Sequence, residues 1–145
     1  MELLPDHVLL QVLNHLDTVA LLSNRQVCRR WRELALHPSL WRHRRLIYDD
    51  FEEDVELAET ALLLAPCLAQ LYLSSKSLLD HALAASTSCR VAELTLRAET
   101  REDAAAAVMV LRNQVSLGGL RALSLLLNSP AAQPSLLGLA DCLQG

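Results

Sequence analysis

Side chains with acid–base or nucleophilic chemistry are scattered along this chain. The five histidines are His7, His15, His37, His43 and His81. The H-E-x-x-H pattern of zinc proteases, the G-x-S-x-G pattern of serine hydrolases and a Gly-rich phosphate loop do not occur. Asp80-His81 is a conceivable dyad with Ser86 or Ser88, but adjacent residues of a helix do not face one another. The sequence therefore predicts a protein that is not an enzyme.

The four cysteines are also far apart: Cys28, Cys67, Cys89 and Cys142. They form no C-x-x-C pair, so we expect neither a zinc site nor a redox motif, and no cofactor. The acidic start at Met1-Glu2 is unlike a secretory signal. The uncharged stretch 122–140 contains two prolines and several polar residues, which argues against a membrane span. We predict reduced thiols and a location in the cytoplasm, the nucleus or both.

Charge is unevenly distributed over the 145 residues, although the net charge is only −4. Residues 1–48 carry seven Arg and four acids, whereas residues 49–59 carry seven acids and no base. The Arg29-Arg30-x-Arg32 and Arg42-x-Arg44-Arg45 clusters are either a solvated face or a nuclear-localisation or nucleic-acid patch. Because bulk charge gives nucleic-acid binding no support, we favour the solvated face. The acidic run suits the first turns of a helix.

The elements of the first 46 residues read as short helices. Pro5 precedes an apolar helical spacing that continues to Leu16, and with about 100° per residue its apolar arc spans roughly 200°. Asp17 can cap a second helix. A third helix is expected to align Val27, Cys28 and Trp31 on an apolar stripe and to end before Pro38. About forty residues rarely sustain a core alone, so these broad apolar surfaces require a partner or packing on the rest of the chain.

The same residues resemble the F-box family. The resemblance rests on Leu-Pro at 4–5, the apolar run 8–16, Leu21-Leu22, Val-Cys-x-x-Trp at 27–31 and Leu-Trp at 40–41. It implies a three-helix F-box that binds the Skp adaptor of SCF ubiquitin ligases and, through it, cullin and RING subunits. The adaptor contacts that it implies are Leu4, Pro5, Val8, Leu9, Val12, Leu13, Leu16, Leu21, Leu22, Val27, Cys28, Trp31, Leu40 and Trp41.

The second part of the chain carries an internal repeat of the form L-x-x-L-x-L. Its copies are Leu68-x-x-Leu71-x-Leu73, Val91-x-x-Leu94-x-Leu96 and Leu120-x-x-Leu123-x-Leu125, with a weaker copy at Leu46 and Tyr48. Periods of 20–29 residues are typical of leucine-rich repeats. Helical stretches near 51–65, 78–83 and 104–111 fill the gaps between the copies. The usual Asn position holds Lys76 and Glu99 and is matched only by Asn128.

Residues between the template leucines are expected to point to the concave side of a short curved solenoid. A mixed polar and aromatic row on such a surface suits protein binding, although solvated filler is the simpler alternative. The candidate substrate-binding residues are Gln70, Tyr72, Ser74, Glu93, Thr95 and Arg97. The corresponding positions of the last copy are Ala122, Ser124 and Leu126.

These patterns together predict a mainly α fold with short parallel strands. Residues 1–46 form the F-box, and residues 47–145 form a leucine-rich-repeat-like α/β solenoid. The expected function is a substrate-recognition subunit of an SCF-type ubiquitin ligase, without nucleic-acid or membrane partners. The alternative is an F-box interaction protein that binds Skp without delivering substrates. Because a last repeat would begin near residue 145, we expect a truncated receptor or a partner-capped end, and self-association of the isolated chain.

Overall fold

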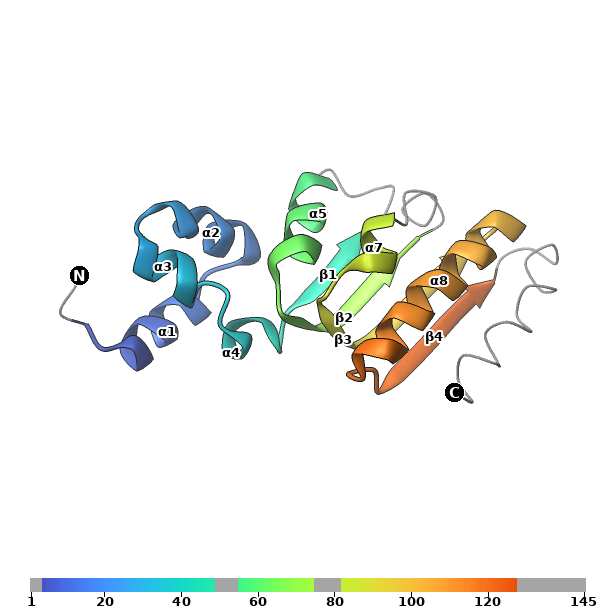
Figure 1. The fold of residues 1–145 in the computed structure, drawn as a ribbon. Coiled ribbons are helices and arrows are strands. Elements are labelled where there is room, and N and C mark those ends of the chain that lie inside the picture. Colours follow the sequence, from blue (N-terminus) through green and yellow to red (C-terminus); the bar gives the residue numbers. More distant parts are fainter. Residues whose placement is uncertain (1–3, 49–54, 75–81, 128–145) are drawn as a thin grey trace.

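The computed structural model describes residues 4–48, 55–74 and 82–127. A cluster of short helices comes first and a parallel sheet with covering helices follows (Figure 1). The elements are α1 (Asp6–Asn14), α2 (Thr18–Ser23), the 3-10 turn η1 (Asn24–Gln26), α3 (Arg29–Leu34), α4 (Pro38–Trp41), β1 (Arg45–Tyr48), α5 (Val55–Leu64), β2 (Cys67–Leu73), α7 (Ala82–Ser86), β3 (Arg90–Ala98), α8 (Arg101–Leu117) and β4 (Ala122–Leu127).

Local capping chemistry sets the bounds of the N-terminal helices. The Asp17 carboxylate accepts a hydrogen bond from the Ala20 amide at 2.7 Å and so satisfies a free donor at the start of α2. This confirms the predicted cap. His37 has extended backbone before α4, and Pro38 occupies a first-turn position where its missing N–H costs nothing.

The four strands form one parallel sheet in the order β1-β2-β3-β4. Leu46 pairs with Leu71, Leu71 with Leu94, and Leu94 with Leu123, so equivalent template positions lie side by side. The predicted register of the leucine template is confirmed, including its weaker copy in β1. Leu71, Leu73, Leu94 and Leu96 are almost fully buried, which explains why the template repeats in each strand.

Helices α5, α7 and α8 lie along one face of the sheet (Figure 1). No helix of the described residues covers the opposite face, which is called the open face below. The longest helix, α8, begins with a capping box in which Thr100 and Asp103 satisfy each other's backbone amides. It ends at Gly118, whose φ of 81° is the left-handed conformation that glycine adopts without steric cost. This turn leads the chain into β4.

A single apolar core extends from the N-terminal helices to α8, including Leu13, Trp41, Leu62, Leu94 and Leu111. The Ala69 amide donates to the Arg44 carbonyl at 2.8 Å, which joins the chain after α4 to β2. The short helices therefore gain stability from packing on the sheet, as their length requires.

The fold is mixed α/β, with a four-stranded parallel sheet after the N-terminal helical region, rather than mainly α. The predicted parallel strands are present. The predicted boundary between residues 46 and 47 falls within β1, whose four residues all pair with β2. Predictions on the acidic segment 49–54, on Asp80 and His81, and on Cys142 lie outside the described residues.

Candidate functional site

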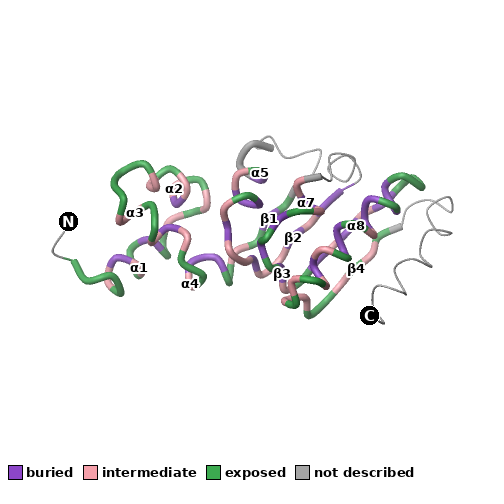
Figure 2. The backbone as a smooth tube through the Cα atoms, viewed as in Figure 1, coloured by how far each residue is buried: buried purple, intermediate pink, exposed green. Residues whose placement is uncertain are grey.

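The N-terminal helices divide their apolar residues between the core and the surface. Along α1, Leu9 and Leu13 are buried, whereas Val12 is 49% exposed. Val19 of α2 is 49% exposed, and Val27 after η1 is 60% exposed. No residue of α3 is buried, and α2 buries Leu21 alone (Figure 2). The wide apolar arc thus fills the core on one side and leaves apolar surface on the other.

The predicted adaptor contacts fall into three groups by exposure. The buried ones are Leu9, Leu13, Leu21, Leu40 and Trp41. The partly buried ones are Val8, Leu16, Leu22 and Trp31. The exposed ones are Leu4, Pro5, Val12, Val27 and Cys28. A partner that docks without opening the core meets the exposed group first, while the buried group holds the helices in place. Sequence reasoning missed Val19 as a surface residue, because α2 is too short to show a reliable apolar period.

The predicted stripe on the third helix requires a correction. α3 begins at Arg29, and Cys28 is an extended, exposed residue before it, with φ −161° and ψ 171°. Val27 and Cys28 therefore precede the helix and do not share a buried face with Trp31, which is half-buried. The apolar residues keep helical spacing across Cys28, although the backbone is extended there. Spacing alone therefore does not show that the helix begins only at Arg29.

The Leu4-Pro5 segment is held in place by Arg30 of α3. The Arg30 guanidinium donates to the Asp6 carboxylate at 2.7 Å and 3.0 Å and also to the Leu4 carbonyl. Since Pro5 precedes the first turn of α1, this contact fixes the direction in which the chain enters the helix. The exposed Leu4 side chain is therefore presented by a defined backbone.

Arg44 was expected on a solvated face, but it lies between the N-terminal helices. Its side chain donates to the carbonyls of Leu16 and Leu40, each at 2.7 Å, and to the Thr18 hydroxyl at 3.3 Å. Burial lowers the pKa of the guanidinium, and Asp17 acts in the opposite direction. Arg44 therefore has a structural role that its place in a basic cluster does not indicate.

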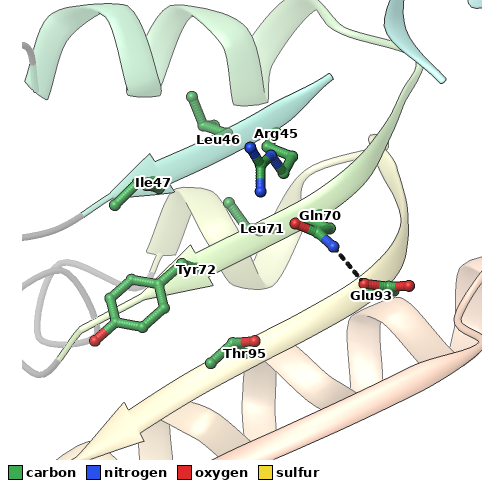
Figure 3. Close-up of a pocket in the computed structure, with 8 residues that line it drawn as sticks. All are labelled: Arg45, Leu46, Ile47, Gln70, Leu71, Tyr72, Glu93 and Thr95. Atoms are coloured by element: carbon green, nitrogen blue, oxygen red, sulfur yellow. Dashed lines mark hydrogen bonds between the residues drawn. The ribbon is translucent and has the colours of Figure 1, made fainter. Parts of the chain in front are cut away.

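The open face of the sheet contains a surface pocket of about 510 Å³. Its walls come from β1, β2 and β3, and the residues that carry its chemistry are Arg45, Ile47, Gln70, Tyr72, Glu93 and Thr95 (Figure 3). The Gln70 amide donates to the Glu93 carboxylate at 2.6 Å across the two strands. The register places Gln70 beside both Arg45 and Glu93, so the pocket has a cationic end at β1 and an anionic end at β3.

Four of the predicted substrate candidates, Gln70, Tyr72, Glu93 and Thr95, thus line one pocket. Arg97 lies farther along β3 and pairs with Glu99 at 3.4 Å. The prediction that Ser74 binds substrate is wrong. Ser74 follows β2 and is only 4% exposed, so it does not present its hydroxyl to a partner. The alternation of side chains holds only while the backbone remains a strand. Arg45 and Ile47 were missed, although the weaker template copy in β1 was sufficient to find them.

The described cysteines are thiols in unreactive surroundings or on the surface. Burial raises the pKa of Cys89 to about 12, and burial also raises the pKa of Cys67. Within residues 4–48, 55–74 and 82–127, no three His, Cys, Asp or Glu side chains gather as a metal site would require. No helix in this part of the chain is long and apolar enough to cross a membrane.

Residues 1–47 match a protein-family model described as F-box-like. This segment includes α1 to α4 and the start of β1, with the exposed apolar residues described above. An F-box domain implies Skp binding in SCF-type complexes, and F-box proteins are generally non-catalytic adaptors of those complexes. The N-terminal segment is therefore similar to the F-box family, over residues 1–47 of the 145.

Proposed function

We propose that this protein is a substrate-recognition subunit of an SCF-type ubiquitin ligase, with the F-box at residues 1–46 and the recognition region in residues 47–145. The observation that carries the proposal is the pairing of an F-box-like segment with an open sheet face. The first offers exposed Leu4, Val12 and Val19, and the second offers the pocket between Arg45 and Glu93.

The proposed recognition region is a short leucine-rich-repeat-like solenoid. Its support is the in-register column of Leu46, Leu71, Leu94 and Leu123, with a helical layer on one side. In such an arrangement each strand buries its leucines against its neighbours, and the open face remains for binding. Tyr72 offers a large amphipathic ring of the kind enriched in protein interfaces.

The protein performs no bond chemistry in this proposal. It binds a substrate on the sheet and Skp on the helices, so that a substrate lysine is held near the charged conjugating enzyme. Holding the two reactants together raises their effective concentration and favours transfer. We also place the protein in the cytoplasm, the nucleus or both, without nucleic-acid or membrane partners.

Co-purification from cells tests the adaptor part of the proposal. A tagged full chain is expected to recover Skp together with cullin and RING subunits. Val12→Asp combined with Val19→Asp introduces two charges into an apolar contact, and recovery is expected to fall at least about tenfold. Leu63→Asp is the matched control, since Leu63 is 65% exposed on α5, outside the F-box.

Reconstituted ubiquitin transfer tests substrate delivery. Proteins recovered with the wild-type chain but not with Tyr72→Ala are offered to the complex with adaptor, cullin, RING and conjugating enzyme. If ubiquitin transfer to these proteins requires Tyr72, the result supports the proposal that the protein is a substrate receptor. Recovery of Skp without cullin or RING would instead favour the alternative, an F-box protein that does not deliver substrates.

A further inference from the structure

The pocket on the open face carries opposite charges on the two sides of Gln70. The parallel register aligns Arg45, Gln70 and Glu93 on neighbouring strands. Gln70 donates to Glu93 at 2.6 Å, and Figure 3 shows Arg45 on the other side of Gln70. Because neighbouring strands lie about 4.8 Å apart, the Cα atoms of Arg45 and Glu93 are separated by about 10 Å. One row of the sheet therefore has a cation at one end and an anion at the other.

Both charges of this row face solvent. Arg45 and Glu93 are exposed, and neither takes part in the ion pairs of the described residues. The hydrogen bond from Gln70 uses the Oε2 atom of Glu93 and leaves Oε1 able to accept from a partner. A uniformly acidic segment would be repelled by Glu93, and a uniformly basic segment would be repelled by Arg45. The row therefore favours a partner that carries one charge of each sign.

An apolar position lies beside this charged row. Tyr72 is two residues after Gln70 on β2, so its side chain is on the same face of the sheet. Ile47 is paired with Tyr72 in the register and is 52% exposed. With a rise of about 3.3 Å per residue, the Cα atom of Tyr72 is about 8 Å from those of Arg45 and Glu93 alike. The face thus offers a cation, an anion, and an apolar position that lies between them and to one side.

This spacing selects a helical partner over an extended one. On an α-helix, side chains at positions i and i+7 share a face and are about 10.5 Å apart, with i+4 between them and to one side. On an extended chain, side chains of one face repeat at about 7 Å and about 13 Å. The separation of about 10 Å between Arg45 and Glu93 therefore matches the helix and neither spacing of the extended chain.

We propose that the open face binds an α-helical segment of a partner protein, with an acidic residue at position i, a large apolar residue at i+4 and a basic residue at i+7. The acidic residue pairs with Arg45, the apolar residue packs on Tyr72 and Ile47, and the basic residue pairs with Glu93. An amphipathic helix recognised through such anchors is an established mode of protein binding. The inference rests on the proposed function for the role of this face, and it adds the chemistry of the recognised segment.

Peptide binding by the full chain in complex with Skp tests the proposal. The probe is a fluorescent, alanine-rich helical peptide with Glu, Leu and Lys at i, i+4 and i+7, and fluorescence anisotropy measures its binding. Four control peptides carry Glu at both charged positions, Lys at both, Ala in place of Leu, or a central Pro that breaks the helix. The mixed-charge peptide is expected to bind saturably, and each control is expected to bind about fivefold more weakly or less.

Charge reversal in the chain locates the contacts. Arg45→Glu is expected to switch the preference to the peptide with two Lys, and Glu93→Lys to the peptide with two Glu, because each variant makes both ends of the row alike. Arg121→Glu and Glu102→Lys are the matched controls. Both residues are exposed and lie outside the pocket, so the same charge changes there should leave the preference unchanged. Circular dichroism of each variant establishes that the fold is intact.

The proposal is overturned if the mixed-charge peptide does not bind saturably, if a uniformly charged or Pro-containing peptide binds equally well, or if the charge reversals do not switch the preference. Sedimentation velocity tests a second copy of this chain as the occupant, and a dimer that Arg45→Glu abolishes would also overturn the proposal. Failure of the proposed function gives a different result, in which the peptide preference follows the charges but the reconstituted complex transfers no ubiquitin to a protein fused to the mixed-charge helix.

Discussion

The guanidinium of Arg44 lies over the indole ring of Trp41, with its central carbon 5.6 Å from the ring centroid. The ring is fully buried, and its Nε1 donates to the Ala35 carbonyl at 2.8 Å. Arg44 reaches from this ring to the carbonyl of Leu16, in the short segment between α1 and α2. The pair therefore joins the first helices to α4, directly before the sheet begins.

Replacing Arg44 by Ala is expected to destabilise the protein by about 2–4 kcal/mol, because carbonyls that accept from a charged donor lose their partner. Urea unfolding followed by circular dichroism measures the change. Arg42→Ala is the control, since Arg42 is exposed, and its effect on the free energy of unfolding should remain within about 0.5 kcal/mol. Equal losses in the two variants would contradict the structural role of Arg44.

The two tryptophans are expected to differ in their contribution to stability. Trp41→Ala should cost about 3–5 kcal/mol, because it removes a fully buried ring and leaves the Ala35 carbonyl without its donor. Trp31 is half-buried, so Trp31→Ala should cost clearly less. Unfolding midpoints in denaturant compare the variants, and a larger loss at Trp31 would argue against the described packing of α3.

Gln114 holds α8 against β3 through two buried hydrogen bonds. Its side-chain oxygen accepts from the Val91 amide, and its nitrogen donates to the Cys89 carbonyl, both at 3.0 Å. Gln114→Ala leaves two buried backbone groups unsatisfied and should cost about 2–4 kcal/mol. Met109→Ala on the exposed side of the same helix is the control. If both variants lower the midpoint of thermal unfolding equally, the buried hydrogen bonds of Gln114 do not account for the loss of stability.

Cys89 is expected to make stability fall at alkaline pH. Burial, with a smaller contribution from Cys67, raises its pKa from 9.0 to about 12. Above pH 9 the unfolded chain releases the thiol proton while the folded chain retains it, so stability decreases as pH rises from about 9 to about 12. The free energy of unfolding, measured in urea at pH 8 and pH 10.5, should decrease less between the two pH values for Cys89→Ala than for the wild type. Cys28→Ala, which removes an exposed thiol, serves as the control.

The sheet was more predictable than the N-terminal helices. The spacing of Leu71, Leu94 and Leu123 determined the register, because each of them must be in the same layer as its neighbours to be buried. In the N-terminal helices, apolar spacing did not reveal that the backbone is extended at Cys28. Nor did it distinguish core residues such as Leu13 from surface residues such as Val12, since both lie on one broad apolar arc. That distinction depends on which helices pack around α1.

The cluster Arg42-x-Arg44-Arg45 shows why charge alone did not locate the sites. Sequence places the three arginines within four positions, yet they end in three different surroundings. Arg42 lines a pocket where β2, β3 and β4 begin, Arg44 lies between the N-terminal helices, and Arg45 lies on the open face. Their variants should therefore separate. Arg44→Ala is expected to lower the free energy of unfolding, whereas Arg42→Ala is expected to leave it nearly unchanged.

Arg45→Ala should reduce the capture of protein partners that Tyr72→Ala also loses, while Skp recovery and stability stay unchanged. Arg45 supplies the cationic end of the open-face pocket, and its removal leaves Glu93 as that pocket's remaining charged wall. Proximity labelling with the wild type and Arg45→Ala measures the set of captured proteins. If the two chains capture the same proteins, the open face does not recognise partners, even if the F-box contacts with Skp remain intact.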